Sequence, residues 1–341
     1  MPIITQDNIA VLRSLSARKA LNIAVSFFTF HLSKLLKRPI VLSGPVSFSV
    51  EPTTSCNLRC PECPSGLRSF SRPTGMIDLK LYDKIINQLS KTAHYLTLYF
   101  QGEPFLHKDF LELVKLAKKK KLYVATSTNA HYIDKEMAEK IVLSGLDRLI
   151  ISIDGLSQET YSQYRVGGKL NKVIEASRFM VEAKRTLKSK NPHLIFQFLV
   201  VKPNEHEVQG VFSLAKELGI DEVRLKTAQI YDFENGSDLM PTQEKYSRYK
   251  LGKEGKYILK NKLENQCWKM WQGCVLTWDG KVVPCCFDKD AHHSMGEMNK
   301  SDFHKIWKSN SYHDFRSKLL KSRAEIDICK NCSEGTKVFE E

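Results

Sequence analysis

The sequence predicts an α/β fold with parallel strands, followed by a small cysteine-rich domain. Two observations support this prediction. Short β-branched segments alternate six times with helix-like segments between residues 46 and 226, which is typical of parallel strands joined by right-handed crossovers. Six of the nine cysteines then follow residue 266, beyond the last of these units. Six units fit an incomplete barrel as well as an open doubly wound sheet, and in both folds functional residues lie at the C-terminal strand ends.

The elements follow one another at regular intervals along the chain. The expected strands span residues 46–50, 95–100, 123–127, 148–154, 194–201 and 222–226. The expected helices span residues 79–89, 109–121, 133–144, 173–187 and 206–218. The segment ENGSDLMP has the composition of a linker, and a polar helical stretch is expected after it. The predicted divisions are an N-terminal helical extension (1–43), an α/β core (44–233), a linker with a helix (234–265) and a cysteine-rich domain (266–341).

The N-terminal segment 24–36 is apolar at helical spacing and follows two basic residues. A signal peptide is disfavoured because His31, Ser33 and Lys34 interrupt the run and no small-residue cleavage site follows. We therefore expect an amphipathic helix, either packed against the core or lying on a membrane surface. No uninterrupted apolar run is long enough to predict a membrane span.

Charge and cysteine content bound the partners and the compartment. The formal net charge is +14, which permits acidic partners. The run KKKK at 118–121 fits a solvated helix face, and no basic segment interleaved with aromatic residues predicts a nucleic-acid partner. The nine cysteines are clustered, and no secretion signal is evident. These observations predict a cytoplasmic, reducing location and bound metal in place of disulfides.

The stretch CNLRCPEC places Cys56, Cys60 and Cys63 in one short loop after the first expected strand. Three thiolates are suited to a four-iron cluster in which one iron keeps an open position for an exogenous ligand. A structural zinc ion requires a fourth ligand nearby. A ferredoxin cluster has a different spacing and a fourth cysteine. The loop therefore predicts an open [4Fe-4S] cluster.

The segment VEPTTSCNLRCPECP resembles the signature of radical S-adenosylmethionine (SAM) enzymes. In that family SAM chelates the open iron, and one electron from the cluster cleaves SAM to methionine and a 5′-deoxyadenosyl radical. That radical abstracts a hydrogen atom from the substrate. The resemblance implies [4Fe-4S] and SAM as cofactors, and an electron donor such as flavodoxin or ferredoxin.

Other strand ends are similar to the family's SAM-binding motifs. QGEP resembles the GGEP motif that binds the SAM amino group, and TSTNA resembles the turn after the third strand. Ser152 and Arg165 are implied to hold the SAM carboxylate, because a guanidinium matches a carboxylate well. Glu62 departs from the pattern, since an aromatic residue that touches the adenine is usual there. The residues expected at the cofactor are Gln101, Gly102, Glu103, Pro104, Asn129, Ser152 and Arg165.

The C-terminal cysteines form a second set, and WDGK is expected to form a hairpin turn within it. Four thiolates complete either a cubane without an open iron or a structural zinc site. The tail resembles the SPASM and twitch extensions of radical SAM enzymes, which implies an auxiliary [4Fe-4S] cluster. The proposed ligands are Cys267, Cys285, Cys329 and Cys332, and Cys274 and Cys286 are left over as substitutes for one of these or as small buried residues.

We interpret the sequence as a radical SAM enzyme with a partial (β/α)6 TIM-like barrel and a small C-terminal iron–sulfur domain. The expected substrate is a peptide or protein that is oxidised or matured. The alternative within enzymes is dehydrogenation of a small molecule. An iron–sulfur electron carrier or sensor without turnover, and a zinc-dependent nucleic-acid-binding protein, are the rivals from other classes. The sequence assigns no residue to the substrate step itself.

Overall fold

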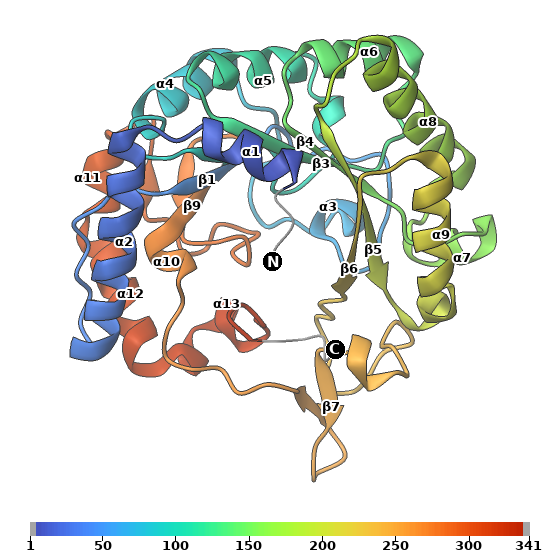
Figure 1. Ribbon diagram of the computed structural model, residues 1–341. Helices are drawn as coiled ribbons and strands as arrows, with labels where there is room; N and C mark the ends of the chain where they lie inside the picture. The colour runs from blue at the N-terminus through green and yellow to red at the C-terminus, as the bar shows by residue number, and fades with distance from the viewer. Residues whose placement is uncertain (1–4, 337–341) are drawn as a thin grey trace.

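The computed structural model describes residues 5–336 and shows helices arranged in an arc around a curved sheet (Figure 1). The ends of the predicted N-terminal extension and C-terminal domain, residues 1–4 and 337–341, lie outside the described residues. The arc remains open on one side, where the hairpin that contains β7 projects away from the sheet (Figure 1).

Six parallel strands form the central part of the sheet. They are β1 (Ser47–Val50), β2 (Tyr95–Thr97), β3 (Tyr123–Thr128), β4 (Arg148–Ser152), β5 (His193–Val200) and β6 (Glu222–Thr227). Each pairs in parallel with the next along the chain. The sheet order is β11-β10-β9-β1-β2-β3-β4-β5-β6, and within residues 5–336 its two edge strands do not pair. The predicted partial barrel is therefore confirmed.

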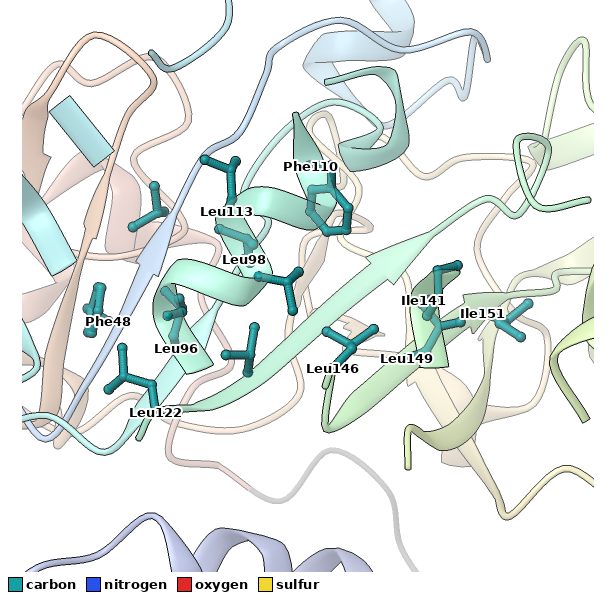
Figure 2. Packing of buried hydrophobic residues seen from close by; sticks show 14 of the residues in the cluster. Phe48, Leu96, Leu98, Phe110, Leu113, Leu122, Ile141, Leu146, Leu149 and Ile151 are labelled. Carbon is teal, nitrogen blue, oxygen red and sulfur yellow. The ribbon is translucent and has the colours of Figure 1, made fainter. Parts of the chain in front are cut away.

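Helices cover the outer face of this sheet (Figure 1). They are α4 (Leu79–Leu89), α5 (Phe110–Lys119), α6 (Lys135–Leu143), α7 (Gln158–Tyr164), α8 (Leu170–Thr186) and α9 (Val208–Leu218). The short helix α7 was not predicted. Figure 2 shows apolar side chains of the strands, such as Leu96 and Leu149, meeting those of the helices, such as Leu113 and Ile141. All four side chains are fully buried, so burial of this interface holds the helices on the sheet.

The cysteine-rich tail is joined to the barrel sheet. It contains α10 (Lys269–Gln272), β9 (Gly273–Leu276), β10 (Lys281–Val283), β11 (Gly296–Glu297), α11 (Phe303–Trp307), α12 (Asn310–Ser322) and α13 (Asp327–Lys330). The predicted WDGK hairpin is confirmed, since β9 and β10 pair antiparallel. Strand β9 also pairs in parallel with β1. A Cβ atom on Gly273 would lie 2.4 Å from the carbonyl oxygen of Ser47, so this close pairing requires glycine.

The prediction of a polar helical stretch in residues 234–265 is wrong. This segment contains one short 3-10 turn, η3 (Glu244–Tyr246), and an antiparallel hairpin of β7 (Tyr249–Leu251) and β8 (Tyr257–Leu259). Gly255 lies in the hairpin turn with φ +73°. Glycine adopts this left-handed backbone conformation without strain and weakens a helix interior. The two glycines of LGKEGK therefore favour a turn.

Two helices precede the barrel, α1 (Gln6–Arg13) and α2 (Ala17–Leu36). Asp7 of α1 contacts Tyr123 and Arg148, the first residues of β3 and β4, so α1 lies at the N-terminal strand ends. One face of α2 packs on the tail: Phe30 contacts the rings of Trp268 and Trp271 at centroid distances of 5.4 Å. Of the two predictions for this helix, packing against the protein therefore applies to one of its faces. Among residues 5–336, no helix has the length and apolar character needed to span a bilayer.

Candidate radical SAM active site

The predicted motifs meet at the C-terminal ends of consecutive parallel strands. The cysteine loop follows β1, QGEP follows β2, the TSTNA segment ends β3, and Ser152 is the last residue of β4. They surround a cavity of about 300 Å³. Nine of the expected site residues line it: Cys56, Cys60, Cys63, Gln101, Gly102, Glu103, Asn129, Ser152 and Arg165. Pro104 does not line the cavity and begins the short helix η1 (Pro104–Leu106).

Local contacts give the cysteine loop its shape. The side chain of Leu58 is 1% exposed and anchors the loop in a small apolar cluster with Tyr164. The helix α3 (Pro64–Leu67) follows the third cysteine. A Cβ atom on its Gly66 would lie 2.5 Å from both the backbone nitrogen and the oxygen of Cys60. Arg68 donates to the carbonyl oxygen of Cys56 at 2.6 Å. The loop is therefore preorganised before any metal binds.

The three thiols of this loop are free, and their surroundings suit a cluster. Burial raises the pKa of Cys56 to about 11, and burial also raises the pKa of Cys60. Two donors face the sulfurs: Asn129 Nδ2 lies 3.9 Å from Cys56 Sγ, and Arg165 Nη1 lies 3.8 Å from Cys60 Sγ. Such donors stabilise metal-bound thiolates and influence the reduction potential of a cluster. The pocket therefore fits a group that takes up deprotonated thiols.

Gly102 allows the QGEP turn to lie directly on the segment that precedes Cys56. Its φ is +74°, and a Cβ atom there would lie 2.3 Å from the carbonyl oxygen of Thr53. The Gly102 N–H donates to Ser65 Oγ at 2.9 Å, and the Glu103 N–H donates to the carbonyl oxygen of Ser55 at 2.7 Å. These contacts fix QGEP relative to the cysteine loop, so glycine is needed at this position.

The carboxylate of Glu103 is largely engaged by the protein. It accepts hydrogen bonds from Thr128 Oγ1 and the Asn129 N–H, both at 2.7 Å, and from the Phe105 N–H at 3.2 Å. The side chain is 2% exposed. An ionised carboxylate has about four acceptor positions, so at least one position is left for a ligand amine. Glu103 thus joins the ends of β2 and β3 and keeps limited capacity for SAM.

Arg165 is held at the end of α7 by a buried carboxylate. Its Nε donates to Asp154 Oδ2 at 2.5 Å, and Asp154 Oδ1 accepts the Leu199 N–H at 2.7 Å. Nη1 faces the Cys60 sulfur, and within residues 5–336 the other amino group, Nη2, makes no hydrogen bond. A guanidinium fixed in this way beside Ser152 suits a ligand carboxylate.

Replacing Arg165 with alanine is expected to weaken SAM binding by about 1.5–3 kcal/mol, the usual contribution of a hydrogen bond to a charged group. Isothermal titration of SAM into anaerobically reconstituted protein measures this change. The variant should also lose roughly 3–5 kcal/mol of unfolding free energy, because Asp154 is left buried without its partner. Arg165→Lys is the control that keeps the charge, and iron content should not change. Unaltered SAM affinity in folded Arg165→Ala would remove this residue from the carboxylate site.

The residues that pack the adenine were not identified from the sequence, since Glu62 replaces the usual aromatic residue. In the structure Glu62 Oε2 accepts the Tyr231 N–H at 3.0 Å and so ties the cysteine loop to the segment after β6. Tyr99 and Phe100 line the cavity and offer aromatic surface for a base. Lys289 of the tail also lines the cavity, and no signal in the sequence connects it with this site.

Three of the four expected cysteine ligands of the tail lie near Arg323, and the fourth, Cys285, packs with two of them. Cys267, Cys285 and Cys329 share an apolar cluster with Trp271. Arg323 Nη2 donates to Cys332 Sγ at 3.4 Å. Burial raises the pKa of Cys267 and Cys329, and the positive charge of Arg323 lowers it. A cation at this position offsets the negative charge of several thiolates.

The two remaining tail cysteines line a second cavity together with Cys285. Cys274 lies in β9 and packs in the main core, where burial raises its pKa above the usual range. Cys286 is exposed. Cys267, Cys285, Cys329 and Cys332 remain the predicted auxiliary ligand set.

Comparison with protein families identifies residues 50–221 as a match to the radical SAM superfamily, which is half of the chain. Residues 267–333 match the SPASM iron–sulfur cluster-binding domain. The chain belongs to the radical SAM superfamily. Its cofactors are therefore SAM and [4Fe-4S] clusters. The residues whose chemistry suits SAM and the open cluster line the cavity at the strand ends.

The relatives of this chain have names that indicate different activities. The tungsten-containing aldehyde ferredoxin oxidoreductase cofactor-modifying protein of Pyrococcus furiosus is 25% identical over 83% of this chain and 86% of its own. PqqA peptide cyclase of Gluconobacter oxydans is 26% identical over 59% of this chain and 55% of its own, so the match spans about half of that relative. Streptococcus suis SuiB, solved with its precursor peptide SuiA, shares the fold with a TM-score of 0.63 at 14% identity, over 91% of this chain and 77% of its own.

Proposed function

We propose that this radical SAM enzyme oxidises or matures a peptide or protein, in two one-electron steps. The observation that carries the proposal is the position of the tail. Strand β9 extends the barrel sheet beside β1, and Lys289, four residues after Cys285, lines the same cavity as Cys56, Cys60 and Cys63. The cysteines of the tail thus belong to the same segment that reaches the SAM cavity. A group that accepts the second electron from the substrate must lie near that cavity. The 26% identity to a peptide cyclase supports a peptide substrate.

The core, the connecting segment and the tail of the chain have separate tasks in this reaction. The α/β core (44–233) binds SAM and the open cluster, the segment 234–265 connects it to the tail, and the cysteine-rich region (266–341) holds the auxiliary cluster. When bound, SAM and the open cluster supply a radical that abstracts hydrogen. Cys56, Cys60 and Cys63 hold that cluster, Asn129 and Arg165 stabilise its thiolates, and an external donor such as flavodoxin or ferredoxin provides the first electron.

Oxidation of a small molecule is the second candidate, because a relative that matches 83% of this chain is named for modifying a cofactor. Hydrogen abstraction distinguishes the two, since the abstracted atom enters 5′-deoxyadenosine. We expect deuterium in 5′-deoxyadenosine when reduced holoenzyme and SAM are incubated with the peptide fraction of cells grown in deuterated medium. Mass spectrometry measures the incorporation. Proteolysis of that fraction should remove it. Deuterium transfer only from the small-metabolite fraction would establish the second candidate.

We further propose that α2 contacts a membrane surface through its exposed apolar side chains. Leu21, Phe28 and Leu35 recur every seven residues and are 66%, 65% and 77% exposed. Basic residues lie along the same helix and just after it: Arg18, Lys34, Lys37 and Arg38 are all exposed. An apolar face accompanied by cations suits an anionic lipid surface.

Phe28→Ser combined with Leu35→Ser is expected to reduce binding to phosphatidylserine-containing vesicles by roughly tenfold or more, because each buried apolar side chain contributes about 1.5–3 kcal/mol. Co-sedimentation measures the bound fraction. Leu143→Ser is the matched control, since Leu143 is 70% exposed on α6. Equal sedimentation of the double variant and the wild type would show that α2 does not contact lipid.

A further inference from the structure

Lys289 brings a positive charge from the tail into the SAM cavity. Its side chain is half-buried and lines the cavity together with the cysteine loop and Arg165. Its Nζ donates to Tyr231 Oη at 2.8 Å and lies 4.8 Å from the centroid of that ring. Tyr231 is 48% exposed, so the pair lies where the cavity meets solvent.

The backbone of Lys289 is fixed to the barrel by a buried ion pair. Its carbonyl oxygen accepts a hydrogen bond from Arg72 Nε at 2.8 Å. The two amino groups of Arg72 bind both oxygens of Glu51, at 2.9 and 2.6 Å, and both side chains are buried. The neighbouring Asp290 accepts the Ser71 N–H at 2.9 Å. Because these contacts hold the Lys289 carbonyl and the Asp290 side chain against the barrel, the ammonium is directed into the cavity.

Among residues 5–336, the ammonium of Lys289 is not in direct contact with a carboxylate, and Glu62 acts on its charge from a greater distance. Within residues 5–336, no carboxylate oxygen lies within 4.0 Å of Lys289 Nζ or of the Arg248 guanidinium. Glu62, the carboxylate on the cysteine loop, already accepts the Tyr231 N–H. Arg248 donates through Nε to Thr227 Oγ1 at 2.7 Å, and its Nη1 is buried without a hydrogen-bond partner.

Lys289 lines the cavity, and Arg248, which does not line it, lies close enough for its charge to act on Lys289. Burial lowers the pKa of Lys289, the thiols of Cys63 and Cys286 and the carboxylate of Glu62 raise it, and the charge of Arg248 lowers it. Burial lowers the pKa of Arg248, and the Cys286 thiol raises it. A partly buried cation that no carboxylate contacts directly is stabilised when a ligand brings a negative charge next to it.

We propose that Lys289, supported by Arg248, binds an anionic group of the substrate at the cavity mouth. This inference rests on the proposed function, and for a peptide the group is a carboxylate of an acidic side chain. Arg165 and Ser152 are assigned to SAM, which leaves the outer cation for the substrate. Tyr231 supplies an aromatic surface beside the ammonium, against which the apolar part of such a side chain can pack.

The test is direct binding to oxidised, SAM-loaded holoenzyme, so that turnover is not required. The probes are two capped tripeptides, glycyl-glutamyl-glycine and glycyl-glutaminyl-glycine, which differ only in charge. We expect the glutamyl peptide to bind at least about tenfold more tightly, as judged by NMR titration. Lys289→Met should remove this preference, and Lys289→Arg should retain it. Lys253→Met is the matched control, because Lys253 is exposed on the β7–β8 turn.

Each other outcome overturns part of the proposal. Equal binding of the two peptides by the wild type would refute a carboxylate site. A loss of SAM affinity in Lys289→Met would assign the ammonium to the cofactor. Tighter binding of glycerol phosphate than of the glutamyl peptide would assign the site to a phosphorylated small molecule. If deuterium comes only from small metabolites while Lys289 still discriminates by charge, the anion site stands and the peptide assignment falls.

Discussion

Simultaneous replacement of Cys56, Cys60 and Cys63 with alanine is expected to reduce SAM cleavage to the background of enzyme-free reactions. These residues lie on one preorganised loop, and no other cysteine lines the cavity that contains Gly102, Ser152 and Arg165 among residues 5–336. Without the thiolates the chain has no ligands for the open cluster at this site, so no electron reaches SAM. Chromatography of 5′-deoxyadenosine and methionine after reduction with dithionite measures the loss.

Metal content provides a second measurement on the same variant. Wild-type protein should bind about eight irons as two cubanes, and the triple variant should retain about four in the tail. Cys274→Ala is the matched control, because Cys274 packs in the main core and lies outside both cysteine sets. It should keep both iron content and SAM cleavage. Formation of 5′-deoxyadenosine by the triple variant at wild-type levels would show that the reactive cluster is elsewhere.

Replacement of Cys329 and Cys332 with alanine is expected to separate SAM cleavage from substrate oxidation. Hydrogen abstraction leaves a substrate radical, and a two-electron oxidation requires loss of one further electron. A cluster held by four protein ligands has no open iron, so electron transfer is the function that fits it. The double variant should still form 5′-deoxyadenosine, while oxidised product should fall to a small fraction of the wild-type yield. Mass spectrometry of both products from one reaction gives the ratio.

Electron stoichiometry sharpens this test. If the electron lost by the substrate radical is recovered through the tail, it can be used for another round of SAM cleavage. Wild-type protein should then form several molecules of 5′-deoxyadenosine for each electron supplied by the external donor, whereas the double variant should form one. Equal product per 5′-deoxyadenosine in the two proteins would exclude electron transfer by the tail. Joint loss of SAM cleavage and solubility would assign the tail a purely structural role. Stoichiometric zinc, with iron for one cluster only, would exclude the auxiliary iron–sulfur cluster.

Much of the fold could be predicted because it is encoded in neighbouring residues. The alternation of short β-branched segments with helix-like segments located all six parallel strands, with differences of a few residues at their ends. The spacing of the first three cysteines, and the motifs at successive strand ends, predicted residues that the structure brings to one cavity. Parallel strands determine this outcome, since their C-terminal ends lie on the same side of the sheet.

Local patterns were insufficient where two local structures compete. The segment after the linker is polar enough to suggest a solvated helix, yet two glycines turn it into the β7–β8 hairpin. Likewise, the sequence suggested Glu103 as a ligand of the SAM amine. It gave no indication that Thr128 and the Asn129 backbone use most of its acceptor capacity.

The sequence by itself determined the chemistry of this protein: a loop with three thiols, strand-end polar residues that suit SAM, and a second set of cysteines. Only the tertiary structure decided how the tail meets the barrel. Strand β9 pairs with β1, and Arg72 holds the carbonyl of Lys289, although those two residues are 217 positions apart. Such contacts leave no periodic or spacing signal, because their free energy depends on surfaces that exist only after both segments have folded. The cation at the cavity mouth is therefore a property of the fold, while the reactive cysteine loop is a property of the sequence.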